Sequence, residues 1–225
     1  MKNKYSKIIY NYVTKMKENL ANELEMLLVI GSSCSNKVIE NWSDIDIILV
    51  ISDYNFEIIE KIKEISNSFE VKIGTTIYTK KEFINKHIDP KTYYHLYLLN
   101  KNEIELQYKK EDLNIPIITF DEIKTTHTPY LYWRIHMFKR LFLYDSLDKE
   151  KVKSMYKITY LIMKALLILN NYLPKNYEEV FKLYSENYDF EYFDYEKFIL
   201  NYMNNDLDYL KIIDYAKKFL ISITK

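Results

Sequence analysis

The pattern of apolar positions divides the chain into two halves. In the first half, short apolar runs of strand length alternate with segments whose apolar residues recur at helical spacing. We predict helices over residues 4–20 and 55–67, and strands in the segments EMLLVIGS, DIDIILVIS and FEVKIGTTIYT. This half should therefore form an α/β or α+β unit with a small mixed sheet.

Two local signals extend this prediction. Thr79 and Glu82 have the spacing of a capping box, which indicates that a helix begins after the third strand. Further on, the segments YYHLYLLN and EIELQYK are separated by Lys101 and Asn102. We interpret these two segments as the strands of a hairpin.

The strand signals stop near residue 120, and the remaining segments all show helical periodicity. They predict a bundle of four or five helices. We therefore expect an α+β protein with a mixed-sheet domain at residues 1–120 and an all-helical domain at residues 121–225.

The amino-acid composition limits the classes of function that the protein could have. Hydrophobic residues make up 48% of the chain, which is enough for a sizeable core, and basic and acidic residues both total 32. This balance argues against a nucleic-acid partner. The N-terminus is amphipathic rather than a signal peptide, and the most apolar run is too short for a membrane span. We expect a soluble, cytoplasmic protein without membrane association.

Cysteine and histidine offer no obvious metal centre. Cys34 is the single cysteine, which excludes an internal disulfide and a Cys/His cluster. The four histidines are scattered without a metal-ligand spacing, so each is more simply read as a surface or core residue.

An aspartate pair is the strongest candidate for chemistry. Asp44 and Asp46 stand at i and i+2 at the start of a predicted strand, so both side chains should leave the same face. Two neighbouring carboxylates repel each other unless a cation lies between them. Magnesium, or manganese, suits such a pair, because Mg²⁺ is held by one or two carboxylates together with substrate phosphates.

The preceding strand ends in Gly31 and Ser32. Glycine is rare in this chain, and here it would let the backbone approach a phosphate closely, while Ser32 adds a hydroxyl and an N–H group. Ser43, directly before the pair, is a further candidate for nucleotide binding. The simpler alternative is that the aspartates are surface residues and Gly31 only turns the chain, but the order of these parts favours a nucleotide and metal site.

This order of parts resembles the nucleotidyltransferase superfamily with the DNA polymerase β-like fold. Ile30, Gly31 and Ser32, followed by Asp44-Ile45-Asp46, match its motif. The order of elements is similar to the small antibiotic (aminoglycoside or kanamycin-type) nucleotidyltransferases. The resemblance implies Mg²⁺-dependent transfer of a nucleoside monophosphate from ATP, or another nucleoside triphosphate, to a hydroxyl of a small acceptor. It implies Asp44 and Asp46 as catalytic metal ligands and Gly31 and Ser32 as triphosphate contacts.

The chain departs from the family in one respect. Such enzymes usually carry a third carboxylate on the next core strand, and there we align Thr75 with the expected position. Glu70 and Glu105 are the acids that could replace it. Gly74 falls mid-strand, which indicates a bulge or a close backbone approach.

The acceptor is less well defined by the sequence. Residues 184–196 carry five acids among aromatic residues, which would suit an aminosugar, although a solvated surface is the simpler reading. Two alternatives stay open: a catalytically weak or inactive nucleotide-binding regulatory protein, and a nucleotidyltransferase of toxin–antitoxin type that modifies proteins. A homodimer would fit, because small enzymes of this kind often place the acceptor between subunits.

Overall fold

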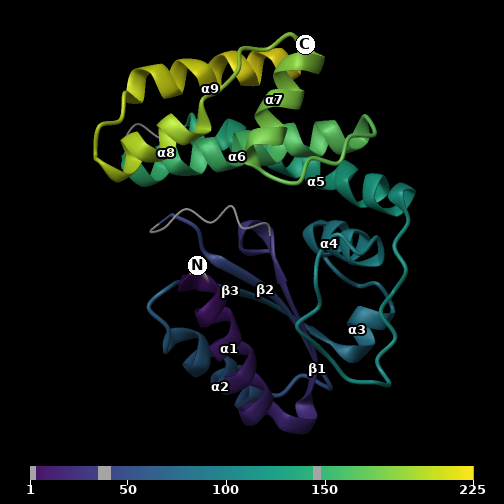
Figure 1. Ribbon diagram of the computed structural model, residues 1–225. Coiled ribbons are helices and arrows are strands. Elements are labelled where there is room, and N and C mark those ends of the chain that lie inside the picture. Colours follow the sequence, from purple (N-terminus) through teal and green to yellow (C-terminus); the bar gives the residue numbers. More distant parts are fainter. Residues whose placement is uncertain (1–3, 35–41, 144–147, 225) are drawn as a thin grey trace. The chain divides into compact units, whose positions relative to one another are not determined.

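The computed structural model describes residues 4–34, 42–143 and 148–224. The chain forms two compact units, Met1–Glu122 and Ile123–Lys225. The first contains a small sheet flanked by helices, and the described residues of the second form helices (Figure 1). The predicted α+β class, with a mixed sheet followed by a helical region, is confirmed.

The sheet of the first unit has four strands in the order β3-β2-β1-β4. They are β1 (Leu24–Ile30), β2 (Ile45–Ile51), β3 (Ile73–Thr79) and β4 (Tyr108–Lys109). β1 pairs antiparallel with both β2 and β4, whereas β2 and β3 run parallel. The three predicted strands are thus the three long strands of the sheet.

One face of the sheet carries the main core of this unit. Ile45, Ile47 and Leu49 alternate along β2 and pack with buried residues of β1 and of helices α1 (Lys4–Leu20) and α2 (Phe56–Asn67). The helices α3 (Lys80–Ile84) and α4 (Pro90–Asn100) lie on the other side of the sheet (Figure 1). The predicted capping box of Thr79 and Glu82 begins α3.

The predicted hairpin is wrong, because YYHLYLLN forms most of α4 and only Tyr108–Lys109 of the second segment pairs as a strand. The helix is started by two residues that precede the segment YYHLYLLN. Asp89 caps it by accepting a hydrogen bond from the Thr92 N–H at 2.7 Å, and Pro90 occupies its first position, where a missing N–H has no cost.

The second unit contains five helices in its described residues: α5 (Phe120–Leu141, which begins in the first unit), α6 (Lys149–Leu169), α7 (Tyr177–Tyr188), α8 (Tyr195–Met203) and α9 (Tyr209–Thr224). α6 packs against α7 and α9, and its buried residues recur along its length. No helix within the described ranges combines the length and apolar character needed to cross a membrane.

Candidate functional site

The predicted site residues meet at one end of the sheet. Gly31 follows β1 directly and opens a 3₁₀ turn, Gly31–Ser33, that also contains Ser32. Asp46 is the second residue of β2 and is paired with Ile30 at the end of β1. The short turn after β1 therefore lies beside the first residues of β2, where the aspartates stand.

The carboxylate of Asp46 lies between the only two glycines of the chain. A Cβ atom at Gly31 would stand 3.1 Å from Oδ2 of Asp46, and one at Gly74 would stand 3.2 Å from Oδ1. Both distances are tighter than ordinary side-chain contacts. The two glycines therefore make the space in which this carboxylate sits, and the predicted close approach at Gly74 is an approach to Asp46.

Helix α4 supplies two residues that the sequence analysis did not assign to the site. Lys91 Nζ lies 3.1 Å from Oδ1 of Asp46, and the Gly31 N–H donates to Nε2 of the buried His95 at 3.3 Å. Because Nε2 accepts, Nδ1 carries the proton and donates to the Lys91 carbonyl at 2.7 Å. The helix-start signal of Asp89-Pro90 would have placed Lys91 and His95 on one helical face, at i and i+4.

A tyrosine fixes the start of α4 against the sheet. The Tyr78 hydroxyl, on β3, donates to Oδ2 of Asp89 at 2.8 Å, and Asp89 is the residue that caps α4. Burial raises the pKa of Tyr78 well above its usual range, so the hydroxyl stays protonated and keeps donating. α4 is thus tied to β3 at its start and to Gly31 through His95.

Asp44 has a more open environment. It stands one residue before β2, and Lys72 Nζ lies 3.6 Å from its Oδ2. The side chains of Asp44 and Asp46 are 36% and 38% exposed, so both carboxylates are accessible to a ligand from solvent. Ser43 is half-buried, and its carbonyl accepts a hydrogen bond from Tyr5 at 3.4 Å.

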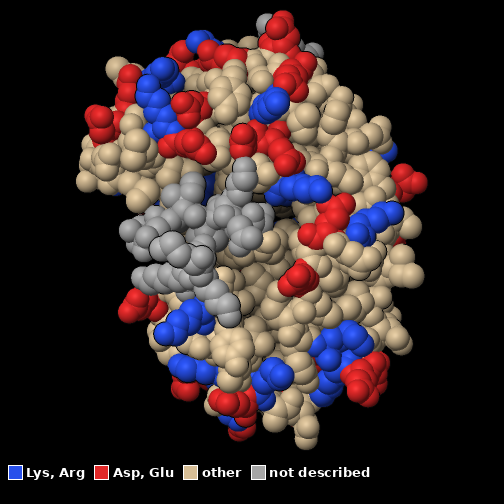
Figure 2. Space-filling model, viewed as in Figure 1, with Lys and Arg blue, Asp and Glu red and all other residues tan. Residues whose placement is uncertain are grey.

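Charges of both signs lie on the surface of the first unit. Basic and acidic side chains are interspersed over the visible face of the first unit, without an extended basic area (Figure 2). Among the described residues, Lys72 pairs with Asp44 and Lys91 pairs with Asp46. Mg²⁺ needs only one or two protein carboxylates and completes its shell with water and phosphate oxygens, so Asp44 and Asp46 are the residues that could hold it.

No family model matches the sequence, and no curated protein matches it. The fold does match a solved structure, the crystal structure of the spectinomycin adenyltransferase AAD(9) from Enterococcus faecialis with ATP and spectinomycin. The match has a TM-score of 0.59 and covers 99% of this chain and 100% of that chain, at 16% sequence identity. The chain has the fold of an antibiotic nucleotidyltransferase. The resemblance expected from the motif is confirmed at the level of the fold.

Within this antibiotic nucleotidyltransferase fold, the alignment of Thr75 with a third carboxylate is wrong. Thr75 pairs with Ile47 and bonds the Tyr12 hydroxyl of α1 at 3.3 Å, so it lies on the opposite face from Asp46. The residue of β3 in register with Asp46 is Gly74, which has no side chain. Neighbouring residues of a strand point to opposite faces, so Thr75 cannot present its side chain beside Asp46.

The two alternative acids lie outside the strands. Glu70 and Glu105 are both exposed, and each stands three residues before its strand begins. In the parts of the chain that the structure describes, no group of three or more His, Cys, Asp or Glu side chains could hold a metal. Asp44 and Asp46 thus remain the candidate metal ligands of this antibiotic nucleotidyltransferase fold.

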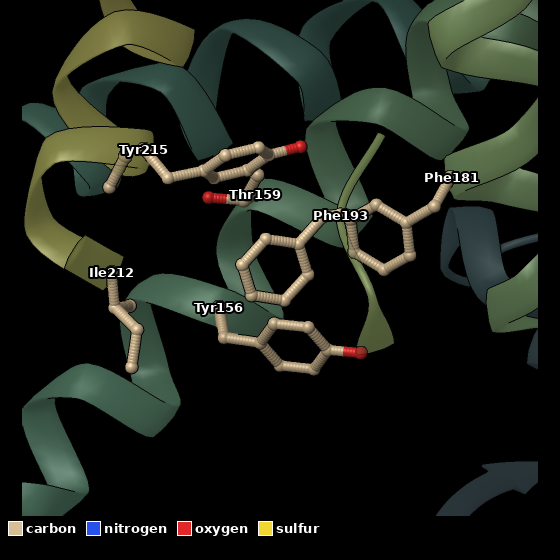
Figure 3. A pocket seen from close by; sticks show the side chains of 7 residues that line it. Tyr156, Thr159, Phe181, Phe193, Ile212 and Tyr215 are labelled. Carbon is tan, nitrogen blue, oxygen red and sulfur yellow. The ribbon is translucent and has the colours of Figure 1, made fainter. Parts of the chain in front are cut away.

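A cavity in the helical unit is too small to serve as a substrate site. It lies among side chains of α6, α7 and α9, which include Tyr156 and Tyr215, and the side chain of Phe193 between α7 and α8 (Figure 3). Its volume of about 10 Å³ suffices for about one water molecule. It therefore cannot hold a nucleotide or a sugar.

The two glycines allow a matched test of the space around Asp46. Gly31 has a φ of +73°, which costs other residues about 1–2 kcal/mol, whereas Gly74 has no positive φ. An added methyl crowds the same carboxylate at both positions. We expect Gly31→Ala to lower the free energy of urea unfolding by about 1–2 kcal/mol more than Gly74→Ala, and we expect both variants to weaken Mn²⁺ binding. Equal effects of the two variants would show that the backbone of Gly31 is not constrained.

Proposed function

We propose that the protein is a Mg²⁺-dependent nucleotidyltransferase that moves AMP from ATP to a hydroxyl of a small acceptor. One observation carries the proposal: Asp46 sits between Gly31 and Gly74, beside the turn after β1, in a chain with the fold of an antibiotic nucleotidyltransferase. A carboxylate confined in this way is held in one place, as a metal ligand must be.

Different site residues would bind the metal and the triphosphate. Asp44 and Asp46 would hold Mg²⁺, which when bound would supply positive charge against the phosphate oxygens of the substrate. The turn of Gly31 and Ser32 would contact the triphosphate through its backbone and the Ser32 hydroxyl. Ser43 would support the nucleotide from the start of β2.

The reaction is a displacement at phosphorus. The acceptor oxygen forms a bond to the α-phosphorus of ATP while the bond from that phosphorus to the bridging oxygen breaks, and pyrophosphate leaves. The hydroxyl of the acceptor loses its proton to a base. The chain contributes chiefly by positioning both substrates and by offsetting charge, which is how phosphoryl-transfer enzymes generally act.

An amine-bearing acceptor of the aminoglycoside or aminocyclitol class fits the helical unit best. Glu178, Asp194 and Glu196 lie around the exposed Tyr192, where burial first and then these carboxylates raise the pKa of the tyrosine. Such a surface attracts a cation through charge and through its aromatic rings. The similar structure contains spectinomycin, which supports the same class of acceptor.

Transfer of a radioactive label tests the proposal. We expect wild-type protein with Mg²⁺ and α-labelled ATP to label one member of a panel containing spectinomycin, streptomycin and kanamycin, and to release one pyrophosphate for each label. The same incubation without acceptor is the control. Absence of labelled product with each of the common nucleoside triphosphates would contradict the proposed activity.

The second candidate is a nucleotide-binding protein without transfer activity. The observation that favours it is the glycine at position 74, where the strand next to Asp46 could have carried a further carboxylate. This candidate predicts metal-dependent ATP binding in calorimetry with neither labelled acceptor nor pyrophosphate. The transfer assay, run beside calorimetry, separates the two functions.

A further inference from the structure

We propose that Lys91 is an exchangeable counter-ion of Asp46. Its ammonium group pairs with the carboxylate while the metal is absent, and moves to the triphosphate when metal and nucleotide bind. This extends the function proposed above, because it takes Asp46 to be a metal ligand. The observation behind it is the 3.1 Å contact between Lys91 Nζ and Oδ1 of Asp46.

The space around Asp46 makes lysine and metal compete. Oδ2 faces the Gly31 backbone and Oδ1 faces Gly74, so the carboxylate has little freedom to turn toward a second cation. Mg²⁺ binds a carboxylate oxygen at about 2.0–2.1 Å. An ammonium group retained on the same carboxylate would repel the ion strongly. The two positive charges would lie close together in a half-buried site, where water screens them less than in bulk solution.

Lys91 is free to move because other contacts hold α4. Tyr78 bonds Asp89 at the start of the helix, and His95 bonds both the Gly31 N–H and the Lys91 carbonyl. The backbone of Lys91 is therefore fixed without its ammonium group. The side chain is 44% exposed, and its long flexible stem can carry the charge to a neighbouring phosphate.

The position of Lys91 in the helix is unfavourable in itself. It is the second residue of α4, whose first turn contains no acid, and a cation near a helix N-terminus is disfavoured by the helix dipole. The ion pair with Asp46 offsets that cost while the metal is absent. A triphosphate would offset it equally well, since phosphate oxygens accept charge-assisted hydrogen bonds from lysine.

The exchange predicts effects of opposite sign in one variant. In Lys91→Met the competing charge is gone, so Mn²⁺ used as the probe should bind about three- to tenfold more tightly in calorimetry without nucleotide. The same variant should bind ATP in the presence of Mn²⁺ about tenfold more weakly, because a charged contact to phosphate is lost. Lys91→Arg, which keeps the charge, should restore most of the ATP affinity.

The control removes a surface charge elsewhere. Lys63 pairs with Glu60 on α2 and both side chains are more than half exposed, so Lys63→Met should change each affinity less than about twofold. If Lys91→Met weakens both metal and ATP binding, the lysine positions Asp46 and the exchange is overturned. If it changes neither, the contact is an ordinary surface ion pair, which also overturns it.

Asp46→Asn separates this inference from the proposed function. Loss of Mn²⁺ binding in Asp46→Asn, with no gain in Lys91→Met, refutes the exchange and leaves the proposed metal site standing. Absence of Mn²⁺ binding in the wild type and in Lys91→Met overturns both. Tighter Mn²⁺ binding in Lys91→Met that is abolished in the double variant with Asp46→Asn is the result expected.

Discussion

Replacement of Asp46 with asparagine should reduce nucleotide transfer by about 10³-fold while the protein stays folded. Asparagine has the size of aspartate, so it fits between Gly31 and Gly74, but it lacks the negative charge that would hold the metal. The charge stabilisation that a bound metal supplies is worth several kcal/mol, and about 1.4 kcal/mol corresponds to a factor of ten in rate. The rate of pyrophosphate release at saturating ATP measures this effect.

The matched control is Asp53→Asn. Asp53 is an exposed aspartate after β2, and its carboxylate accepts a hydrogen bond from the Tyr54 N–H at 2.8 Å. Asp53→Asn changes the net charge by the same amount as Asp46→Asn, so it controls for the loss of one negative charge. Transfer by Asp53→Asn should stay within about twofold of the wild type. An Asp46→Asn protein that transfers at the wild-type rate would exclude Asp46 from the reaction.

The glycine turn and the aspartates could be predicted because their signals are local. Gly31, Asp44 and Asp46 occur in one short segment, and an apolar strand on each side of it brings the ends together. A motif of this kind needs no knowledge of distant residues. The structure adds Gly74, which is remote in sequence and reaches Asp46 through the parallel pairing of β2 and β3.

α4 could not be recognised from periodicity. Its segment YYHLYLLN is apolar at nearly every position, so neither a period of two nor one of 3.6 stands out, and Tyr94, His95, Leu96 and Leu98 are all buried. The capping residues Asp89 and Pro90 identify the segment as a helix, but they lie outside the apolar run. Because the segment was interpreted as part of a hairpin, the helix that brings Lys91 and His95 to the site was not predicted.

The position of Thr75 shows a second limit. The strand itself was predicted, but its register against β2 depends on pairing that a single sequence does not reveal. Thr75 stands one residue after Gly74, which is in register with Asp46, and it therefore lies on the face that packs against α1. Strand existence is a local property, whereas register is a property of the sheet.

The largest effect on stability is expected at the other end of β1. Glu25 is buried, with its side chain 4% exposed, and Lys80 and Lys110 lie 3.1 Å and 2.8 Å from its two carboxylate oxygens. Removing one partner of a buried ion pair costs about 3–5 kcal/mol, because the remaining charge has lost its counter-ion. Lys80 also pairs with Asp112, and both lysines are about a quarter to a third exposed, so the low end of that range applies.

We therefore expect Glu25→Ala to lower the free energy of unfolding of the first unit by about 3 kcal/mol. Urea unfolding followed by tryptophan fluorescence measures it in a Trp133→Phe background, where the buried Trp42 of the first unit is the one remaining tryptophan. Urea is preferable to guanidinium, whose ions screen charge pairs. The Glu60→Ala control removes a partner of an exposed pair and should cost less than about 0.5 kcal/mol.

Glu25→Gln distinguishes lost charge from lost volume in the same experiment. Glutamine fills the space of glutamate but cannot neutralise Lys80 and Lys110, so it should cost nearly as much as alanine if the ion pairs stabilise the unit. Metal and ATP affinities should not change in either folded variant, because Glu25 lies at the end of β1 remote from Gly31. Stability equal to the wild type in Glu25→Gln, with a large loss only in Glu25→Ala, would assign the effect to a cavity and contradict the electrostatic explanation.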